Sequence, residues 1–69
     1  MKPIAEIQSL CPCWVITSDG KRYKCDAAIE IRPGGILSFK DGETEQFIMD
    51  ESIVAYEGIA DKNIRLSNR

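Results

Sequence analysis

The chain has 69 residues, no histidine and a formal net charge of −2. This length allows one small domain with a thin margin of stability, and it excludes a large enclosed active site. Without histidine, a Ser–His or Cys–His catalytic pair and a histidine-ligated metal ion are impossible within one chain. With 43% apolar and 29% charged residues, the composition is that of a globular domain.

Residues 1–12 form a leading segment. Residues 3–10 fit one short helix, because Pro3 is favourable at a first helical position and apolar residues follow at intervals of three. An irregular strand is the alternative. No apolar run approaches the ~20 residues that span a bilayer, and Glu6 and Gln8 interrupt the segment, which therefore does not resemble a signal peptide. We expect a cytoplasmic protein with reduced cysteines and no membrane partner.

Short strands are expected after this segment. Isoleucine outnumbers leucine by ten to three, and β-branched residues favour strands over helices. Turn signals at Asp19-Gly20, Pro33-Gly34-Gly35 and Asp41-Gly42 separate the apolar segments, which is typical of antiparallel strands joined by hairpins. The predicted strands are 13–18, 22–32, 36–40, 43–49, 53–56 and a short last one at 63–66.

The segment 22–32 alternates most clearly between apolar and charged residues. Its charged residues occupy even-numbered positions, so a strand here has one solvent-exposed face and one buried face. The residues expected on the buried face are Tyr23, Cys25, Ala27, Ile29 and Ile31.

Together these elements predict a mainly β fold. We expect a small single domain with a strongly bent antiparallel sheet, or a five-to-six-stranded barrel of SH3-like or Sm-like architecture, with one short N-terminal helix. Residues 13–57 form the strand core, and residues 58–69 carry the last strand and a basic tail. The likeness to such barrels is one of architecture, and no motif ties the chain to a family.

Several of the predicted strands are apolar on both faces, although a strand in one small barrel turns only one face inward. We expect residues 1–12 to cover part of the second face, or its side chains to form an interface with a protein partner or a second copy of the chain. The residues expected inside are Cys13, Val15, Phe47, Met49, Ile53 and Ala55. Those left outside are Trp14, Ile16, Ile48, Val54 and Tyr56.

Charge is unevenly distributed. Residues 41–61 contain seven acidic residues and no basic one, which suits a basic partner, although such charges also serve solubility. In size and charge the chain resembles small acidic inhibitors, including viral proteins that block nucleic-acid enzymes, and this resemblance implies an inhibitor encoded by a virus or mobile element. The predicted partner-binding residues are Trp14, Ile48, Val54 and Tyr56, with an acidic rim of Asp41, Glu43, Glu45, Asp50 and Glu51.

A basic cluster at the first hairpin supports an alternative function. Lys21, Arg22 and Lys24 surround Tyr23, and such residues contact phosphates and stack on bases. A homo-oligomeric small barrel would repeat the cluster and bind nucleic acid or a nucleotide through many weak contacts. A solvated hairpin tip also accounts for these residues, because three cations are few and the isoelectric point is about 5.0.

The three cysteines are predicted to be core thiols, with Cys13 and Cys25 inside and Cys11 the most exposed. Structural zinc requires four ligands, and the chain has no fourth cysteine. We therefore expect no metal ion or other cofactor within one chain; a site completed by another subunit is the least favoured alternative. A disulfide between Cys13 and Cys25 fits adjacent strands but not a reducing compartment.

Catalysis is not expected. Asp26 and Glu30 lie on one face of a predicted strand but about 13 Å apart, which is too far for a pair of catalytic carboxylates. The segment Pro33-Gly34-Gly35 lies between two strands rather than before a helix, so it does not form a phosphate-binding loop. The sequence predicts a non-enzymatic binding protein.

Overall fold

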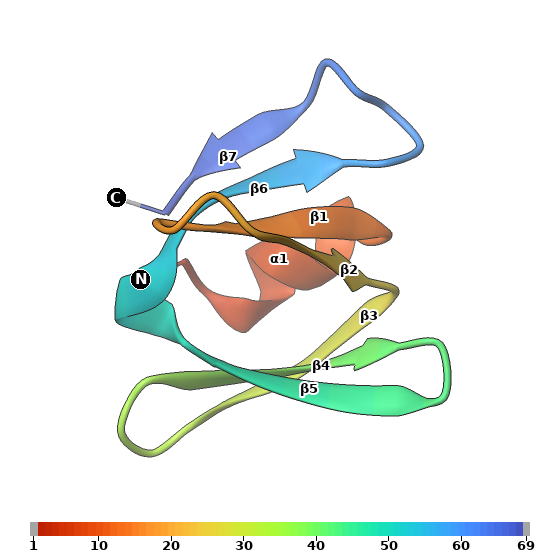
Figure 1. The fold of residues 1–69 in the computed structure, drawn as a ribbon. Helices are drawn as coiled ribbons and strands as arrows, with labels where there is room; N and C mark the ends of the chain where they lie inside the picture. Colours follow the sequence, from red (N-terminus) through yellow and green to blue (C-terminus); the bar gives the residue numbers. More distant parts are fainter. Residues whose placement is uncertain (1, 69) are drawn as a thin grey trace.

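The computed structural model describes residues 2–68, which form one short helix and seven strands in two antiparallel sheets (Figure 1). The mainly β fold with a short N-terminal helix is confirmed. Within the described residues, the two sheets do not close into a barrel. In chain order the elements are α1 (Ile4–Leu10), β1 (Cys13–Thr17), β2 (Arg22–Cys25), β3 (Ala27–Arg32), β4 (Ile36–Asp41), β5 (Thr44–Met49), the 3-10 turn η1 (Asp50–Ser52), β6 (Ile53–Gly58) and β7 (Arg65–Ser67).

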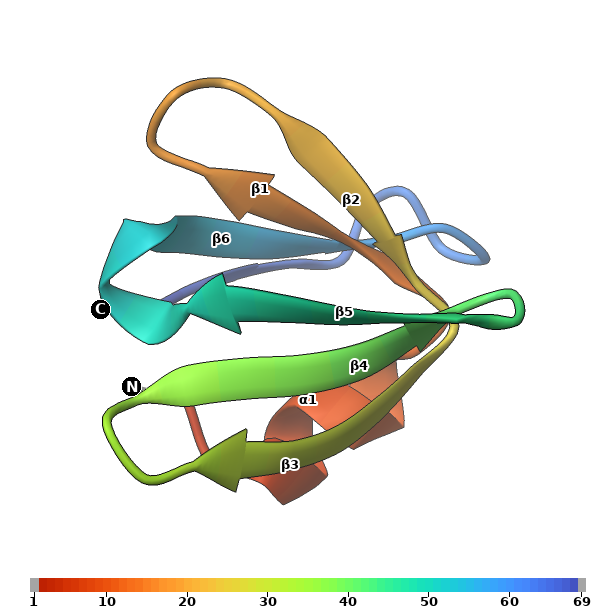
Figure 2. The same ribbon diagram turned by 60° about the horizontal axis from the view of Figure 1, so that its bottom comes forward.

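The first sheet has the strand order β2-β1-β6-β7, and the second sheet has the order β3-β4-β5 (Figures 1 and 2). Hairpins at the expected turns connect β1 to β2, β3 to β4 and β4 to β5. Gly20 and Gly42 have φ angles of +86° and +62° in two of these turns, a conformation that side chains with a Cβ atom rarely adopt. The strand pairing therefore follows the turn signals of the sequence.

The prediction of one continuous strand over residues 22–32 is wrong. The chain bends at Asp26, whose backbone N–H donates to the Lys40 carbonyl and whose carboxylate accepts from the backbone N–H of Gly42. These contacts end β2 in the first sheet and start β3 in the second. A register shift between Ala28 and Glu30 then reverses the alternation, so Ala28 is buried whereas Ile29 is 42% exposed.

The core lies between the sheets and is closed on one side by α1. Ile7 is fully buried and belongs to the same apolar cluster as Val15, Phe39 and Tyr56, and the helix packs against β3 of one sheet and β6 of the other. Burial of each such side chain contributes about 1.5–3 kcal/mol. Residues 1–12 therefore do not cover the face of β1 that carries Trp14; α1 packs on the opposite, core-facing side.

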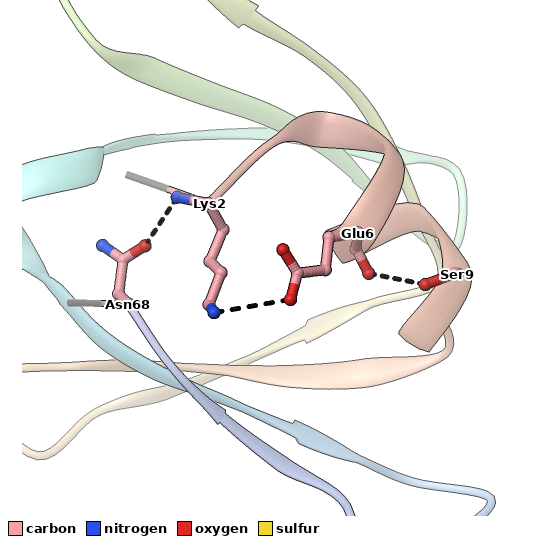
Figure 3. Close-up of polar contacts among 4 residues, drawn as sticks. All are labelled: Lys2, Glu6, Ser9 and Asn68. Atoms are coloured by element: carbon pink, nitrogen blue, oxygen red, sulfur yellow. Dashed lines mark hydrogen bonds and ion pairs between the residues drawn. The ribbon is translucent and has the colours of Figure 1, made fainter.

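Asn68 connects the two ends of the described chain. Its side-chain amide is buried and donates to the backbone carbonyls of Ile53 and Asp50 at 2.9 and 3.1 Å. Its Oδ1 accepts from the backbone N–H of Lys2, whose ammonium group pairs with Glu6 of α1 (Figure 3). One amide thereby ties the segment before α1 and the segment after β7 to the start of β6.

None of the helices within residues 2–68 has the length and apolar character that crossing a bilayer requires.

Candidate functional site

The outer face of the second sheet carries an exposed apolar patch, which consists of Ile36, Phe47 and Met49. Met49 lies opposite Ile36 on the neighbouring strand, and Phe47 is two residues before it on the same face of β5. Phe47 and Met49 are 48% and 42% exposed. The expectation that both residues point inward is wrong, because Ile48, Leu37 and Phe39 occupy the core-facing side of this hairpin.

Charged and polar groups adjoin this apolar patch. The Arg32 guanidinium lies 5.0 Å from the centre of the Phe47 ring and pairs with Glu30 at 3.2 Å. Ser38, directly opposite Phe47, is only 1% exposed, and in the part of the chain that the structure describes its hydroxyl has no hydrogen-bond partner. The Arg32 guanidinium thus lies over the ring of Phe47, about half of whose surface is exposed to solvent.

A cleft of about 340 Å³ separates β5 from the β1–β2 hairpin. Three consecutive residues, Phe47, Ile48 and Met49, line one wall, while Thr17, Asp19 and Tyr23 are among those of the other wall. Consecutive residues of a strand point to opposite faces of the sheet, so a cleft over one face would contact only every second residue. A cleft lined by Phe47, Ile48 and Met49 together must therefore run along the edge of β5. In the strand pairing of residues 2–68, β5 pairs with β4 alone, so its free edge opens into this cleft.

The four apolar residues predicted to bind a partner do not form one surface. Tyr56 is fully buried in the core opposite Val15, so its expected role as an exposed anchor is wrong. Ile48 is partly buried and packs against the core from the second sheet. Trp14 and Val54 are half-buried in the first sheet. Among the described residues, the large apolar side chains that are exposed are instead Ile29, Phe47, Met49 and Ile64.

The acidic rim flanks the apolar patch at both ends of β5. Asp41 and Glu43 lie at the turn that precedes this strand, and Asp50 and Glu51 follow it in η1. Glu45 lies on β5 two residues before Phe47 and therefore on the same face. Glu43, Glu45 and Glu51 are exposed, while Asp41 and Asp50 are half-buried. The predicted carboxylates thus lie along β5 and at its two ends, on the hairpin that carries Phe47 and Met49 and not on the strand that carries Trp14.

The basic cluster of the first hairpin is divided between two faces. Tyr23 lies opposite Val15 and packs against the core, whereas Arg22 and Lys24 lie on the outer face with Trp14. The Arg22 guanidinium is 6.0 Å from the Trp14 ring and 2.8 Å from a carboxylate oxygen of Glu57. Lys24 pairs with Asp26 at 3.6 Å, and Lys21 is exposed at the turn. Tyr23 therefore lies on the core-facing side, as expected for this strand, and shares no face with Arg22 and Lys24.

The three cysteines meet at one end of the core. The β1–β2 register places Cys13 directly opposite Cys25, and Cys11 follows the end of α1. The Cys11 Sγ atom lies 3.5 Å from that of Cys25 and 4.0 Å from that of Cys13, and all three sulfurs lie within 4.8 Å of one another. As expected, Cys13 and Cys25 are fully buried and Cys11 is the most exposed.

Contacts within this thiol cluster make its members electrostatically unequal. Hydrogen bonds from the thiols of Cys13 and Cys25 hold the pKa of Cys11 well below its ordinary value. The contact with Cys11, together with burial, raises the pKa of Cys13 and of Cys25. Cys11, the most exposed of the three, is therefore the thiol that loses its proton most readily.

No protein family, curated protein or solved structure matches this chain.

Proposed function

We propose that this chain is a small non-enzymatic binding domain that engages a protein partner through the apolar patch and the free edge of β5. The exposure of Phe47 and Met49 on one face of an edge strand carries this proposal. Adjacent exposed apolar side chains mark contact sites in soluble domains, and large side chains of this kind contribute most of the binding energy once they are buried.

Strand addition is the binding mode that this geometry supports. An edge strand has unpaired backbone N–H and C=O groups, and an extended segment of a partner satisfies them by pairing as a further strand. The cleft of about 340 Å³ along β5 provides space for side chains of the added segment. Phe47 and Met49 on the outer face would pack against the side chains of the added segment that point to the same face.

The acidic residues around the apolar patch favour a partner whose binding surface has an apolar centre surrounded by basic groups. Carboxylates lie at both ends of β5, and complementary charges steer association and fix orientation more than they add affinity. A protein with a basic groove has this property. The same complementarity supports an inhibitory role, in which the domain occupies such a groove.

Selection from a library of displayed extended peptides tests the proposal. We expect selected peptides to have basic residues around an apolar centre and to shift the backbone amide NMR signals of β5. The variants Phe47→Ala and Met49→Ala should each weaken peptide binding by tenfold or more, which corresponds to about 1.4 kcal/mol.

The matched control is Trp14→Ala, which removes a half-buried aromatic side chain from the other sheet. It should leave peptide affinity unchanged. Peptides that shift the signals of β1 and β2 instead, or that bind Phe47→Ala as tightly as the unmodified domain, would contradict the proposal.

Nucleic-acid or nucleotide binding by a homo-oligomer is the second candidate function. Its support is the outer face of the first sheet, where Trp14 lies beside Arg22 and where Lys24 is exposed. Fluorescence polarisation with labelled oligonucleotides and nucleotides at two salt concentrations distinguishes the candidates. Binding that weakens with salt and is lost in Arg22→Glu supports this function, and no binding at low salt removes it.

A further inference from the structure

The thiol cluster of Cys11, Cys13 and Cys25 has the dimensions of a metal site. A metal–sulfur bond is about 2.3 Å long, so an ion at the centre of three sulfurs holds them about 4 Å apart. The Cys11 sulfur lies 3.5 Å from that of Cys25 and 4.0 Å from that of Cys13, and no two sulfurs in the cluster are more than 4.8 Å apart. Small rotations of the side chains are enough to bring all three sulfurs into coordination distance.

Three different elements hold these sulfurs in place. Cys13 is the first residue of β1 and Cys25 the last of β2, and the antiparallel pairing fixes them opposite each other. Cys11 is the residue at which α1 ends, and the helix is anchored by the burial of Ile7. The arrangement therefore depends on the fold as a whole, and the unfolded chain would not keep the three sulfurs together.

The donor set selects a soft metal ion. Thiolate sulfur is a soft ligand that favours Cu(I) and Zn(II) among biological ions. Structural zinc is four-coordinate, and no carboxylate of residues 2–68 joins the three sulfurs as a fourth ligand. Two sulfurs are buried, whereas Cys11 is partly exposed and gives an ion access from solvent.

We propose that Cys11, Cys13 and Cys25 form a three-coordinate thiolate site for Cu(I). Each thiol that binds the ion loses its proton to solvent, and a sulfur–copper bond replaces the S–H bond. No electron is transferred, so the step needs no oxidant or reductant. This site is independent of the apolar patch, and it stands or falls separately from the proposed function.

Competition with a coloured Cu(I) chelator under anaerobic, reducing conditions tests the site on the purified chain. We expect the protein to remove one Cu(I) ion per chain from the chelator. Loss of a residue that only supports a metal ligand weakens binding by about 10–100-fold. Because Cys11 would bind the ion directly, Cys11→Ser should weaken it by more than 100-fold.

Ala5→Ser is the matched control, because it introduces a serine at an exposed position of α1 outside the cluster. Its Cu(I) affinity should equal that of the unmodified chain. Failure to take copper from the chelator, an undiminished affinity of Cys11→Ser, or Zn(II) binding without Cu(I) binding would each overturn the proposal.

X-ray absorption of the copper-loaded, unmodified chain keeps the test decisive even if Cys11→Ser fails to fold. Three sulfur neighbours around copper support the site. Two sulfur neighbours, or a shell that includes nitrogen or oxygen, contradict it.

Discussion

Tyr56 combines complete burial of its ring with a hydroxyl that has no hydrogen-bond partner among residues 2–68. A buried hydroxyl without a partner reduces stability by about 1–3 kcal/mol compared with one that is hydrogen-bonded. The aromatic ring contributes apolar burial at the centre of the core, where it faces Val15. The ring and the hydroxyl of this residue therefore have opposite effects on stability.

We expect Tyr56→Phe to raise the free energy of unfolding at pH 7 by about 1 kcal/mol, because the substitution removes only the unpaired hydroxyl. Burial also raises the pKa of Tyr56. Above pH ~10 the unfolded tyrosine releases its proton while the folded one retains it, so stability falls as pH rises, by about 1.4 kcal/mol per pH unit. Urea titrations between pH 7 and 11 should show this additional loss in the unmodified chain and not in Tyr56→Phe.

Tyr56→Ala serves as the comparison for the ring, and it should lower the free energy of unfolding by about 3–5 kcal/mol. A Tyr56→Phe variant that is less stable at pH 7 would show that the hydroxyl has a stabilising partner. A variant that loses stability in alkali as steeply as the unmodified chain would show that the pH dependence does not arise from Tyr56.

At the scale of elements, Asn68 supplies hydrogen bonds to backbone carbonyls at the junction of η1 and β6, just beyond the last residue of β7. Its amide donates to carbonyl groups of Asp50 and Ile53, and its backbone N–H donates to the Val54 carbonyl. The bond to the Ile53 carbonyl is buried, and a buried carbonyl that loses its donor reduces stability by about 1–3 kcal/mol. The short strand β7 is therefore held by one side chain beyond its end as well as by its pairing with β6.

Asn68→Ala should lower the free energy of unfolding by about 2 kcal/mol and increase hydrogen exchange at the amides of β7. Chemical denaturation and exchange measured by NMR check these two effects. The matched control is Asn63→Ala at an exposed position, which should stay within about 0.5 kcal/mol of the unmodified chain. Equal stability of the two variants would rule out the bracing role of Asn68.

The strands could be predicted largely from turn signals and β-branched residues, because those signals are local. The break at Asp26 could not, since it depends on Lys40 and Gly42, which are more than ten residues away. The faces of β5 were assigned wrongly for a related reason. Phe47, Ile48 and Met49 are three apolar residues in a row, and only the packing of β4 against the core decides which of them point inward.

The thiol cluster was accessible to sequence reasoning only in part. The turn at Asp19-Gly20 sets the hairpin register that places Cys13 opposite Cys25. Cys11 joins them because α1 ends beside the hairpin, and the direction in which the helix packs is a tertiary property. The convergence of all three sulfurs therefore depends on tertiary packing and not on the spacing of the cysteines along the chain.

For the molecule as a whole, small size makes any bound ligand a large part of the stability. An ion whose free concentration is one hundred times its dissociation constant adds about 2.7 kcal/mol to the free energy of unfolding. Each kcal/mol raises the melting temperature of a domain this small by about 4–8 °C. We therefore expect buffered Cu(I) to raise the melting temperature by more than about 10 °C. Anaerobic calorimetry measures this shift, which should be absent in Cys11→Ser; an equal shift in that variant would place the ion elsewhere.

The hydrogen bond between Lys2 and Asn68 brings the two ends of the described chain close enough to be joined covalently. Residues at the two ends of the described chain already touch, so a short covalent bridge between them would close the backbone into a ring without distorting the fold. Ring closure restricts the unfolded chain far more than the folded one. Cyclisation is therefore a route to stabilising this domain that leaves the apolar patch, the cleft and the thiol cluster unchanged in sequence.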